Sequence, residues 1–157
     1  FEIDVHKAGL HLELHLAEPP QATSHVDTLF PLVEVDPDRI AQVVDNIIHN
    51  AINHSVKGSV IRMTLAFPTG QDNALSTDVQ ICIEDSGTGI AAVDLPHIFD
   101  RFYRGKQKAT RGHGIGLAIC KQIIDAHRGK IWAESELGTG ATFCFTLPVY
   151  TFDNNDV

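Results

Sequence analysis

Three asparagines in the first half of the chain fall at helical spacing. Asn46, Asn50 and Asn53 stand at positions i, i+4 and i+7, so on a helix they would share one face. Asparagine is a mediocre helix former, and an exposed polar face that happens to be rich in asparagine is the alternative explanation. Because an amide oxygen can join a magnesium shell completed by phosphates and waters, the pattern favours a polar site that binds metal and phosphate.

Two glycine-rich segments could hold other parts of a ligand. Residues 85–90 (DSGTGI) follow an apolar stretch; their glycines would let the backbone approach a planar group, and a buried Asp85 would accept a hydrogen bond from an exocyclic amine. A plain turn is the alternative. Residues 112–117 (GHGIGL) open an expected helix, whose first N–H groups favour an anion. Neither a dinucleotide fingerprint nor a P-loop fits, because a basic loop precedes this segment and GK[ST] is absent.

Charge is concentrated at one place in the chain. The formal net charge of −8 argues against a nucleic-acid or anionic-membrane surface, which would need a basic face. A solvated loop is the usual explanation for a run of charge, but this run lies directly before the second glycine segment, which indicates contact with phosphate. Five of the twelve basic residues fall in this window: Arg101, Arg104, Lys106, Lys108 and Arg111.

The three cysteines, Cys82, Cys120 and Cys144, are far apart and show no CxxC spacing. An odd, scattered set predicts buried, free thiols in a reducing compartment. No apolar run approaches the ~20 residues of a membrane span, and no secretory start is present. Since the chain begins with Phe1, we expect it to be a piece of something longer.

Hydrophobic periodicity predicts the elements that position these residues. Alternation predicts strands, and Asp36 followed by Pro37 predicts the capped start of a long amphipathic helix. Strands are expected at 10–16, 29–35, 60–67, 79–85, 131–134 and 141–147, with helices from 37, at 94–102 and from 112–116. The order favours an α+β fold, a two-layer α/β sandwich in which a mainly antiparallel mixed sheet packs on one layer of helices. Residues 1–150 are expected to form a single domain, and 151–157 a frayed tail.

In this order and spacing, these pieces resemble the ATP-binding domain of sensor histidine kinases, in the GHKL superfamily. The resemblance covers residues 10–148. Its five motifs are an N-box at 46–55, glycine boxes at 85–90 and 112–117, an F-box at 99–105, and a last glycine element at 138–140 before Ala141-Thr142-Phe143. It implies a Bergerat fold with ATP under a mobile lid formed by residues 103–113.

The resemblance also implies roles for individual residues. Asp85 would bind the adenine amine with Gly89 beside the ring, and Asn50 would bind Mg. Asn46, Arg101 and Arg104 are the catalytic candidates, Asn46 assisting at the phosphates and the arginines steadying the γ-phosphate. The full ATP-binding set is Asn46, Asn50, Asn53, His54, Asp85, Gly87, Gly89, Ile90, Phe102, Tyr103, Arg104, Gly112, His113, Gly114, Ile115, Gly116, Leu117 and Thr142.

Two positions on the N-box depart from the commonest pattern of the family, and a third separates histidine kinases from their relatives. Asn53 replaces a frequent Lys or Arg, and His54 an aromatic such as Tyr. Asn46 stands where the gyrase, mismatch-repair, chaperone and anti-sigma-factor relatives carry Glu, and an amide cannot accept the proton of an attacking water. This favours a phosphate donor to a histidine supplied elsewhere. The alternatives are an anti-sigma-type serine kinase and a non-catalytic nucleotide sensor.

None of the nine histidines has the context of a phosphoacceptor. His25 lies between prolines with no helical pattern, while His11 and His15 are expected on the solvated face of an edge strand, with a metal site as the alternative. The resemblance therefore implies a separate phosphoacceptor and dimerisation domain (a homodimer in the parent kinase) and a response regulator downstream. No nucleic acid and no direct membrane contact are expected of this domain, which we place in the cytoplasm whether or not the parent is membrane-anchored.

Overall fold

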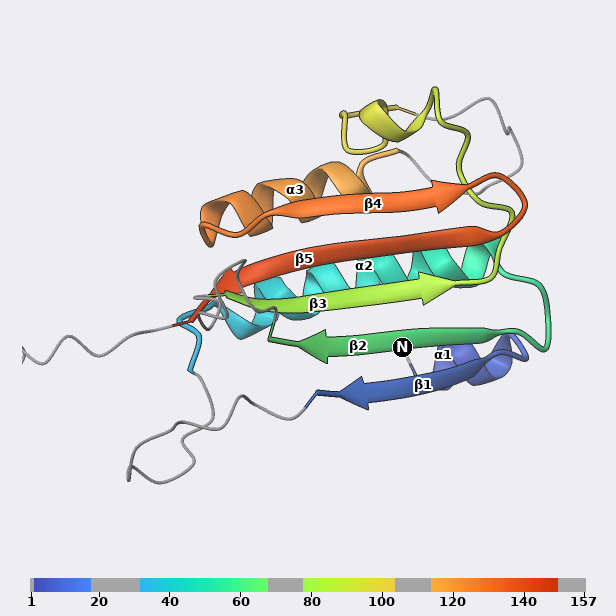
Figure 1. Ribbon diagram of the computed structural model, residues 1–157, viewed down its shortest axis with the longest axis horizontal. Helices are drawn as coiled ribbons and strands as arrows, with labels where there is room; N and C mark the ends of the chain where they lie inside the picture. Colours follow the sequence, from blue (N-terminus) through green and yellow to red (C-terminus); the bar gives the residue numbers. More distant parts are fainter. Residues whose placement is uncertain (1, 18–31, 68–77, 104–113, 150–157) are drawn as a thin grey trace, which may run out of the picture.

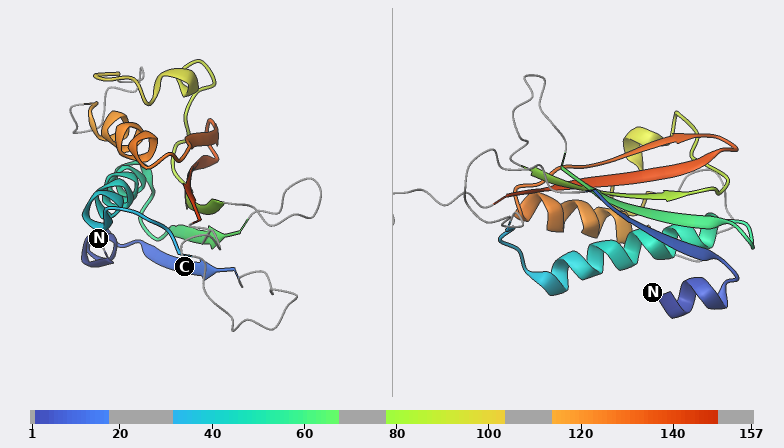
Figure 2. Two further views of the ribbon diagram at one scale, coloured as in Figure 1. Left: turned by 90° about the vertical axis from the view of Figure 1, so that its left-hand side faces the viewer. Right: turned by 60° about the horizontal axis from the view of Figure 1, so that its bottom comes forward.

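The computed structural model describes residues 2–17, 32–67, 78–103 and 114–149. They build one five-stranded sheet whose helices all lie on the same side, as the two views of Figure 2 show. The elements in chain order are α1 (Glu2–Lys7), β1 (His11–Leu16), α2 (Pro37–His54), β2 (Val60–Ala66), β3 (Asp78–Asp85), the 3-10 turn η1 (Leu95–His97), α3 (Gly116–Ala126), β4 (Ile131–Glu136) and β5 (Gly140–Pro148).

The sheet runs in the order β1-β2-β3-β5-β4 (Figure 1). β1 pairs with β2 in parallel, and every other neighbouring pair is antiparallel. The predicted two-layer α+β sandwich with a mainly antiparallel mixed sheet is therefore confirmed. Since side chains alternate between the faces of a strand, Ile81 and Ile83 point toward the helices, and Gln80, Cys82 and Glu84 point the other way. We call this second face, opposite α2 and α3, the open face.

Local chemistry explains where α2 begins. The Asp36 carboxylate accepts hydrogen bonds from the backbone N–H groups of Asp38 and Arg39 at 3.1 and 3.2 Å, and Pro37 occupies the first turn, where its missing N–H costs nothing. The helix then buries one apolar stripe against the sheet and α3: Val43, Val44, Ile47, Ile48 and Ala51. The predicted capped, amphipathic helix is confirmed, and its opposite face is free to carry the asparagines.

Three local predictions differ from the structure. The described part of the expected strand at 29–35 makes only an isolated bridge from Val33 to Val149. The expected helix at 94–102 is reduced to η1, whose start has no side-chain cap, because the Asp94 carboxylate instead accepts the Tyr103 hydroxyl at 2.7 Å. Six residues at the start form α1, which was not predicted; this helix buries Val5.

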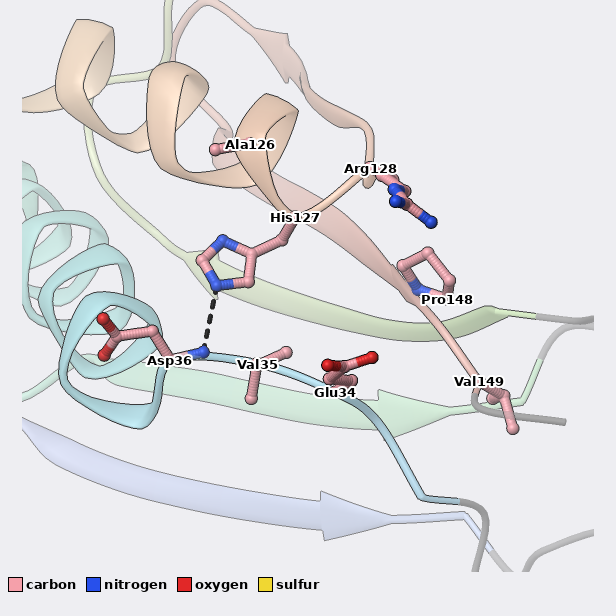
Figure 3. A pocket seen from close by; sticks show the side chains of 8 residues that line it. All are labelled: Glu34, Val35, Asp36, Ala126, His127, Arg128, Pro148 and Val149. Carbon is pink, nitrogen blue, oxygen red and sulfur yellow. Dashed lines mark hydrogen bonds between the residues drawn. The ribbon is translucent and has the colours of Figure 1, made fainter. Parts of the chain in front are cut away.

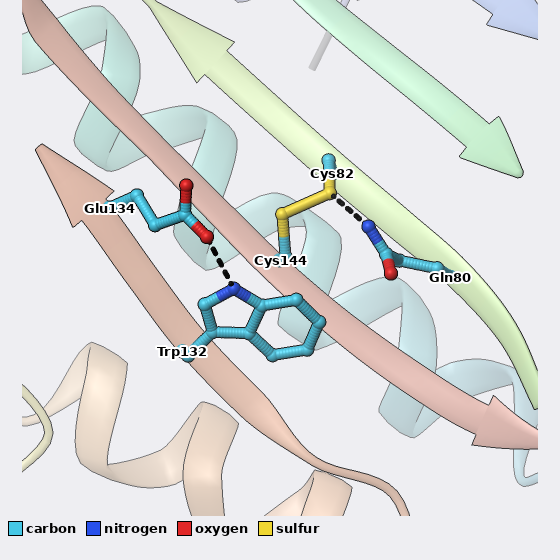
Figure 4. The surroundings of a disulfide bond; sticks show 5 residues. All are labelled: Gln80, Cys82, Trp132, Glu134 and Cys144. Atoms are coloured by element: carbon cyan, nitrogen blue, oxygen red, sulfur yellow. Dashed lines mark hydrogen bonds between the residues drawn. A yellow bond between two sulfur atoms is a disulfide. The ribbon is translucent and has the colours of Figure 1, made fainter. Parts of the chain in front are cut away.

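The expectation of three free thiols is wrong. Cys82 and Cys144 are joined in a disulfide (Figure 4), and only Cys120 is free and buried. The two partners are 62 residues apart in the chain, but the β3–β5 register places them directly opposite each other with their Cα atoms 4.1 Å apart. Sequence spacing alone does not reveal such a pair, since the register depends on the whole sheet.

β1 is an edge strand of the sheet. On the open face, Glu13 pairs with Arg62 at 3.3 Å, and Arg62 also reaches Glu84 at 3.1 Å. In the described ranges, no three His, Cys, Asp or Glu side chains gather as a metal site. The solvated edge-strand interpretation of His11 and His15 is thus favoured. Within the same ranges, no helix has both the length and the apolarity to cross a bilayer.

Candidate functional site

Asp85 is a buried carboxylate at the end of β3, with only 5% of its surface exposed. One of its oxygens accepts a hydrogen bond from the Gly87 N–H at 2.8 Å. Burial raises the pKa of the Asp85 carboxyl above its ordinary 3.8, and the N–H groups of Gly87 and Ala141 offset this only in part. A partly desolvated carboxylate of this kind is a strong acceptor for an N–H donor that enters the site.

The raised pKa of Asp85 predicts how ligand binding depends on pH. If the ionised carboxylate accepts a hydrogen bond from the adenine amine, ATP affinity should fall as the pH drops through this raised pKa, hence at a higher pH than for an exposed aspartate. Fluorescence or calorimetric titration of ATP across a pH series would measure this. The same series on Asp85→Asn should be flat over that range, and an identical fall in the variant would assign the pH dependence to another group.

The two glycines of the first glycine segment stand where a side chain would not fit. A Cβ at position 87 would overlap both the His54 carbonyl at the end of α2 and the Asp85 carboxylate. Gly89 has φ +68° and its Cβ would overlap the Glu136 carbonyl, so any other residue there would be strained and displaced. The segment is thereby fixed between the end of α2 and the β4–β5 hairpin, with Asp85 beneath it.

Hydrogen bonds tie this segment to the β4–β5 hairpin. The Ile90 N–H donates to the Ser135 hydroxyl at 2.8 Å, and that hydroxyl donates to the Gly140 carbonyl at 2.6 Å. The Gly138 N–H donates to the Thr88 carbonyl at 2.8 Å. Ser135 was not among the predicted residues. The sequence pattern gives no sign that its hydroxyl bridges two loops, and only the structure reveals this role.

The asparagine face of α2 meets the start of α3. Asn46 and Asn50 are half-buried and Asn53 is exposed. The Asn46 carboxamide oxygen lies 3.6 Å from where a Cβ of Gly116 would stand. The Cys120 thiol donates a hydrogen bond to the Val43 carbonyl at 3.8 Å. Burial raises the pKa of this thiol to about 11, and the nearby Asn46 side chain partly offsets the shift. The structure thus places Asn46 of the N-box beside Gly116 of the second glycine box, and adds Cys120 as an unpredicted neighbour of Asn46.

The residues on either side of the predicted lid are joined by a hydrogen bond. The Phe102 N–H donates to the Gly114 carbonyl at 2.9 Å, and the Tyr103 ring lies against His97 with centroids 5.3 Å apart. Phe102 has a positive φ of 63° and is 72% exposed, so it faces solvent.

The remaining predicted residues of this region differ in placement. Arg101 and Ile115 are exposed, and Leu117 packs against the core. Arg104, Gly112 and His113, with the rest of the predicted lid, lie outside the described residues.

Thr142 is not brought to the site. Its register partners are Glu84 and Glu134, so it lies on the open face, whereas Asp85 and its partner Ala141 point to the other face. The position beside the carboxylate therefore belongs to Ala141, whose backbone N–H bonds to Asp85. His54 is half-buried and close enough for its charge to act on Asp85.

A hollow of about 690 Å³ lies at the other end of both helices (Figure 3). There the His127 ring links them, its Nε2 accepting the Asp36 N–H at 3.1 Å while Nδ1 lies 2.7 Å from the Ile123 carbonyl. Asn46 and Asn50 stand in the later turns of α2, and Gly116 begins α3, so this hollow is separate from the surroundings of Asp85. Its lining consists of Glu34, Val35, Asp36, Ala126, His127, Arg128, Pro148 and Val149.

Comparison with known proteins agrees with this geometry. The model of the histidine kinase-, DNA gyrase B- and HSP90-like ATPase family matches residues 35–151. The adaptive-response sensory kinase SasA of Synechococcus sp. (strain JA-2-3B'a(2-13)) is 43% identical over 83% of this chain and 33% of its own length. The sensor histidine kinase WalK of Bacillus subtilis (strain 168) is 44% identical over 74% of this chain and 19% of its own. The chain thus spans a third or less of these relatives.

Solved structures give the same result. The catalytic domain of histidine kinase ThkA has a TM-score of 0.71 and 30% identity, covering 95% of this chain and 85% of that domain. Full-length ShkA, solved in complex with AMPPNP, has a TM-score of 0.74 and 25% identity, covering 96% of this chain and 28% of ShkA. This chain therefore belongs to the histidine kinase-, DNA gyrase B- and HSP90-like ATPase family, and its relatives there are sensor histidine kinases.

Proposed function

We propose that this chain is the catalytic, ATP-binding domain of a two-component sensor histidine kinase, which donates the γ-phosphate of ATP to a histidine on a separate dimerisation domain. The observation that carries the proposal is the buried Asp85 carboxylate at the end of β3, next to Gly87, which packs against His54 at the end of α2. The middle of the same helix carries Asn46, which lies beside Gly116 at the start of α3, and Figure 1 shows α2 and α3 along the same side of the sheet. A carboxylate that can accept from a purine amine, the asparagines of α2 and the N-terminus of α3 support a nucleotide site on this side of the sheet.

The residues present fit ATP. Asp85 would accept from the adenine amine, and Gly89, which has no side chain to obstruct it, would lie beside the ring. The N-terminus of α3 carries no side-chain cap, so its first N–H groups remain available for phosphate oxygens. The exposed Arg101 and, by the family resemblance, Arg104 would steady the γ-phosphate.

The residues also fit magnesium. The half-buried amide of Asn50 lies one turn after Asn46 on the same face of α2, and an amide oxygen is a hard, neutral ligand that adds no charge against the phosphates. Bound magnesium would neutralise phosphate charge during transfer. We assign Asn50 as its protein ligand, with Asn46 assisting at the phosphates.

Asn46 distinguishes transfer from hydrolysis. An amide cannot accept a proton at neutral pH, and burial raises the pKa of the neighbouring Cys120 thiol to about 11, so neither group is a base that could activate water. Positioning and charge neutralisation would then serve a nucleophile brought from outside, as is general for phosphoryl transfer. The anti-sigma-type alternative is not favoured, since the relatives are sensor histidine kinases.

The partners follow from the same proposal. We infer a cytoplasmic domain that acts within a homodimeric parent kinase and supplies a response regulator with phosphate. The net charge of −8 supports the absence of nucleic-acid and direct membrane contacts.

The test is phosphotransfer to the dimerisation domain of the parent kinase. With Mg-ATP, the wild-type chain should label that domain with acid-labile, base-stable phosphate, and Asn50→Ala should lose at least about tenfold in rate, because one metal ligand is gone. Gln122→Ala removes an exposed amide on α3 and is the matched control, which should transfer normally. Acid-stable phosphate on the partner, or rapid ATP hydrolysis by the chain alone, would contradict the proposal.

A further inference from the structure

The Cys82–Cys144 pair sits in the middle of the sheet, on its open face (Figure 4). β3 and β5 are internal strands, and α2 and α3 lie on the opposite side, so no described helix covers the pair. A disulfide in this place can be approached by a solute without opening the core.

The two sulfurs differ in access. Cys82 is half-buried, whereas Cys144 is only 4% exposed and the indole of Trp132, its register partner on β4, lies beside it. Since thiol–disulfide exchange requires in-line access to the attacked sulfur, an incoming group reaches Cys82 first. Cys144 is placed to react only with the Cys82 sulfur, once that sulfur carries a small thiol in a mixed disulfide.

The Cys82 sulfur also accepts a hydrogen bond from a neighbouring side chain. The Gln80 side-chain amide donates to the Cys82 sulfur at 3.1 Å, and a hydrogen bond to the charged form stabilises that form. Negative charge on the Cys82 sulfur, whether it attacks or leaves, is therefore supported by a neighbour on its own strand. Cys120 lacks this access, because it is fully buried against the core, and it is the unpaired thiol of the described residues.

We propose that Cys82 and Cys144 form a reversible thiol–disulfide exchange site for low-molecular-weight thiols and disulfides, with Cys82 as the reactive sulfur and Cys144 as the resolving one. The cytoplasmic location inferred above supports reversibility, because disulfides in that compartment are usually transient and redox-sensing. Access to one of the two sulfurs, here Cys82, is what exchange requires.

The oxidation balances as two exchanges. The Cys82 thiolate attacks one sulfur of a small disulfide R–S–S–R, forming Cys82–S–S–R and releasing one thiolate, R–S⁻. The Cys144 thiolate then attacks the Cys82 sulfur, forming the Cys82–Cys144 bond and releasing the second R–S⁻. Two electrons pass from the cysteines to the small disulfide, and the two cysteine protons end on the released thiols. Reduction by two R–SH is the reverse.

The experiment equilibrates the native chain with mixtures of reduced and oxidised glutathione, traps it with acid and an alkylating agent, and maps the cysteines by mass spectrometry. We expect one two-electron transition and a glutathione adduct on Cys82. Fluorescence of Trp132, the sole tryptophan, should change with the same midpoint, since a neighbouring disulfide quenches indole. Cys120 should stay unmodified, which also reports that the fold is intact.

Single variants separate the two roles. Cys144→Ser should accumulate the mixed disulfide on Cys82, whereas Cys144 in Cys82→Ser should react at least about tenfold more slowly, because access controls the rate. Gln80→Ala should slow the reaction of Cys82. Equal rates at the two sulfurs, a wild-type disulfide that glutathione reduces only after denaturation, or two free thiols in oxidised glutathione would each overturn the proposal.

Discussion

Replacing Asp85 by asparagine should weaken ATP binding by about 10- to 150-fold, because a charged hydrogen bond of about 1.5–3 kcal/mol is lost. An asparagine can still accept the Gly87 N–H that holds the loop, so the change affects mainly the acceptor offered to the adenine amine. Calorimetric titration with Mg-ATP measures the dissociation constant. A loss of this size would place the adenine ring of ATP at the end of β3.

Stability separates a lost contact from a damaged fold. The pKa of Asp85 is raised in the folded chain, so its neutral form favours folding below about pH 4, and this stability is lost as the pH rises through the raised pKa. Asparagine stays neutral, and Asp85→Asn should therefore unfold at no lower denaturant concentration than wild type at pH 7. Weak ATP binding by a fully stable variant would then be a property of the site.

Glu84→Gln is the matched control for this variant. It neutralises the adjacent carboxylate of β3, which is exposed on the open face and paired with Arg62 at 3.1 Å, and should leave ATP affinity within about twofold, since exposed ion pairs contribute little. An unchanged dissociation constant in Asp85→Asn, or an equal loss in Glu84→Gln, would remove the adenine assignment.

The parts of the fold that depend on neighbouring residues could be predicted. The start of α2 follows from Asp36 and Pro37, whose effects act within one turn. β3 follows from the alternation of Val79, Ile81 and Ile83. Because Asp85 continues that alternation, its burial also follows from the sequence.

The parts of the fold that depend on the register of distant strands could not be predicted from the sequence. The Cys82–Cys144 pair exists only because β5 is inserted between β3 and β4. Thr142 was expected near the adenine, but the register puts it opposite Glu84 on the open face, since a shift of one residue exchanges the two faces of a strand. A motif match identifies a position in the sequence, but the pairing of the strands decides to which face of the sheet its side chain points.

The same register gives the second large expected effect. Reducing the Cys82–Cys144 bond should lower the free energy of unfolding by about 4 kcal/mol, because opening a loop of 62 residues restores chain entropy to the unfolded state. For a chain of this size, the melting temperature should fall by about 8–16 °C. Since domains are typically stable by only about 5–15 kcal/mol, the oxidised and reduced forms would differ strongly in their unfolded fractions.

The measurement is thermal unfolding with and without a reductant, in wild type and in Cys144→Ser. Wild type should lose stability when reduced, whereas the variant has no bond to break and should unfold at one temperature in both conditions, close to that of reduced wild type. This comparison cancels any effect of the reductant on the buried Cys120 thiol.

Equal melting temperatures for oxidised and reduced wild type would show that the bond does not constrain the unfolded chain. A difference that persists in Cys144→Ser would assign it to another thiol. The expected pattern would show that the redox state of Cys82 and Cys144, in the centre of the sheet, sets the stability of the nucleotide-binding domain.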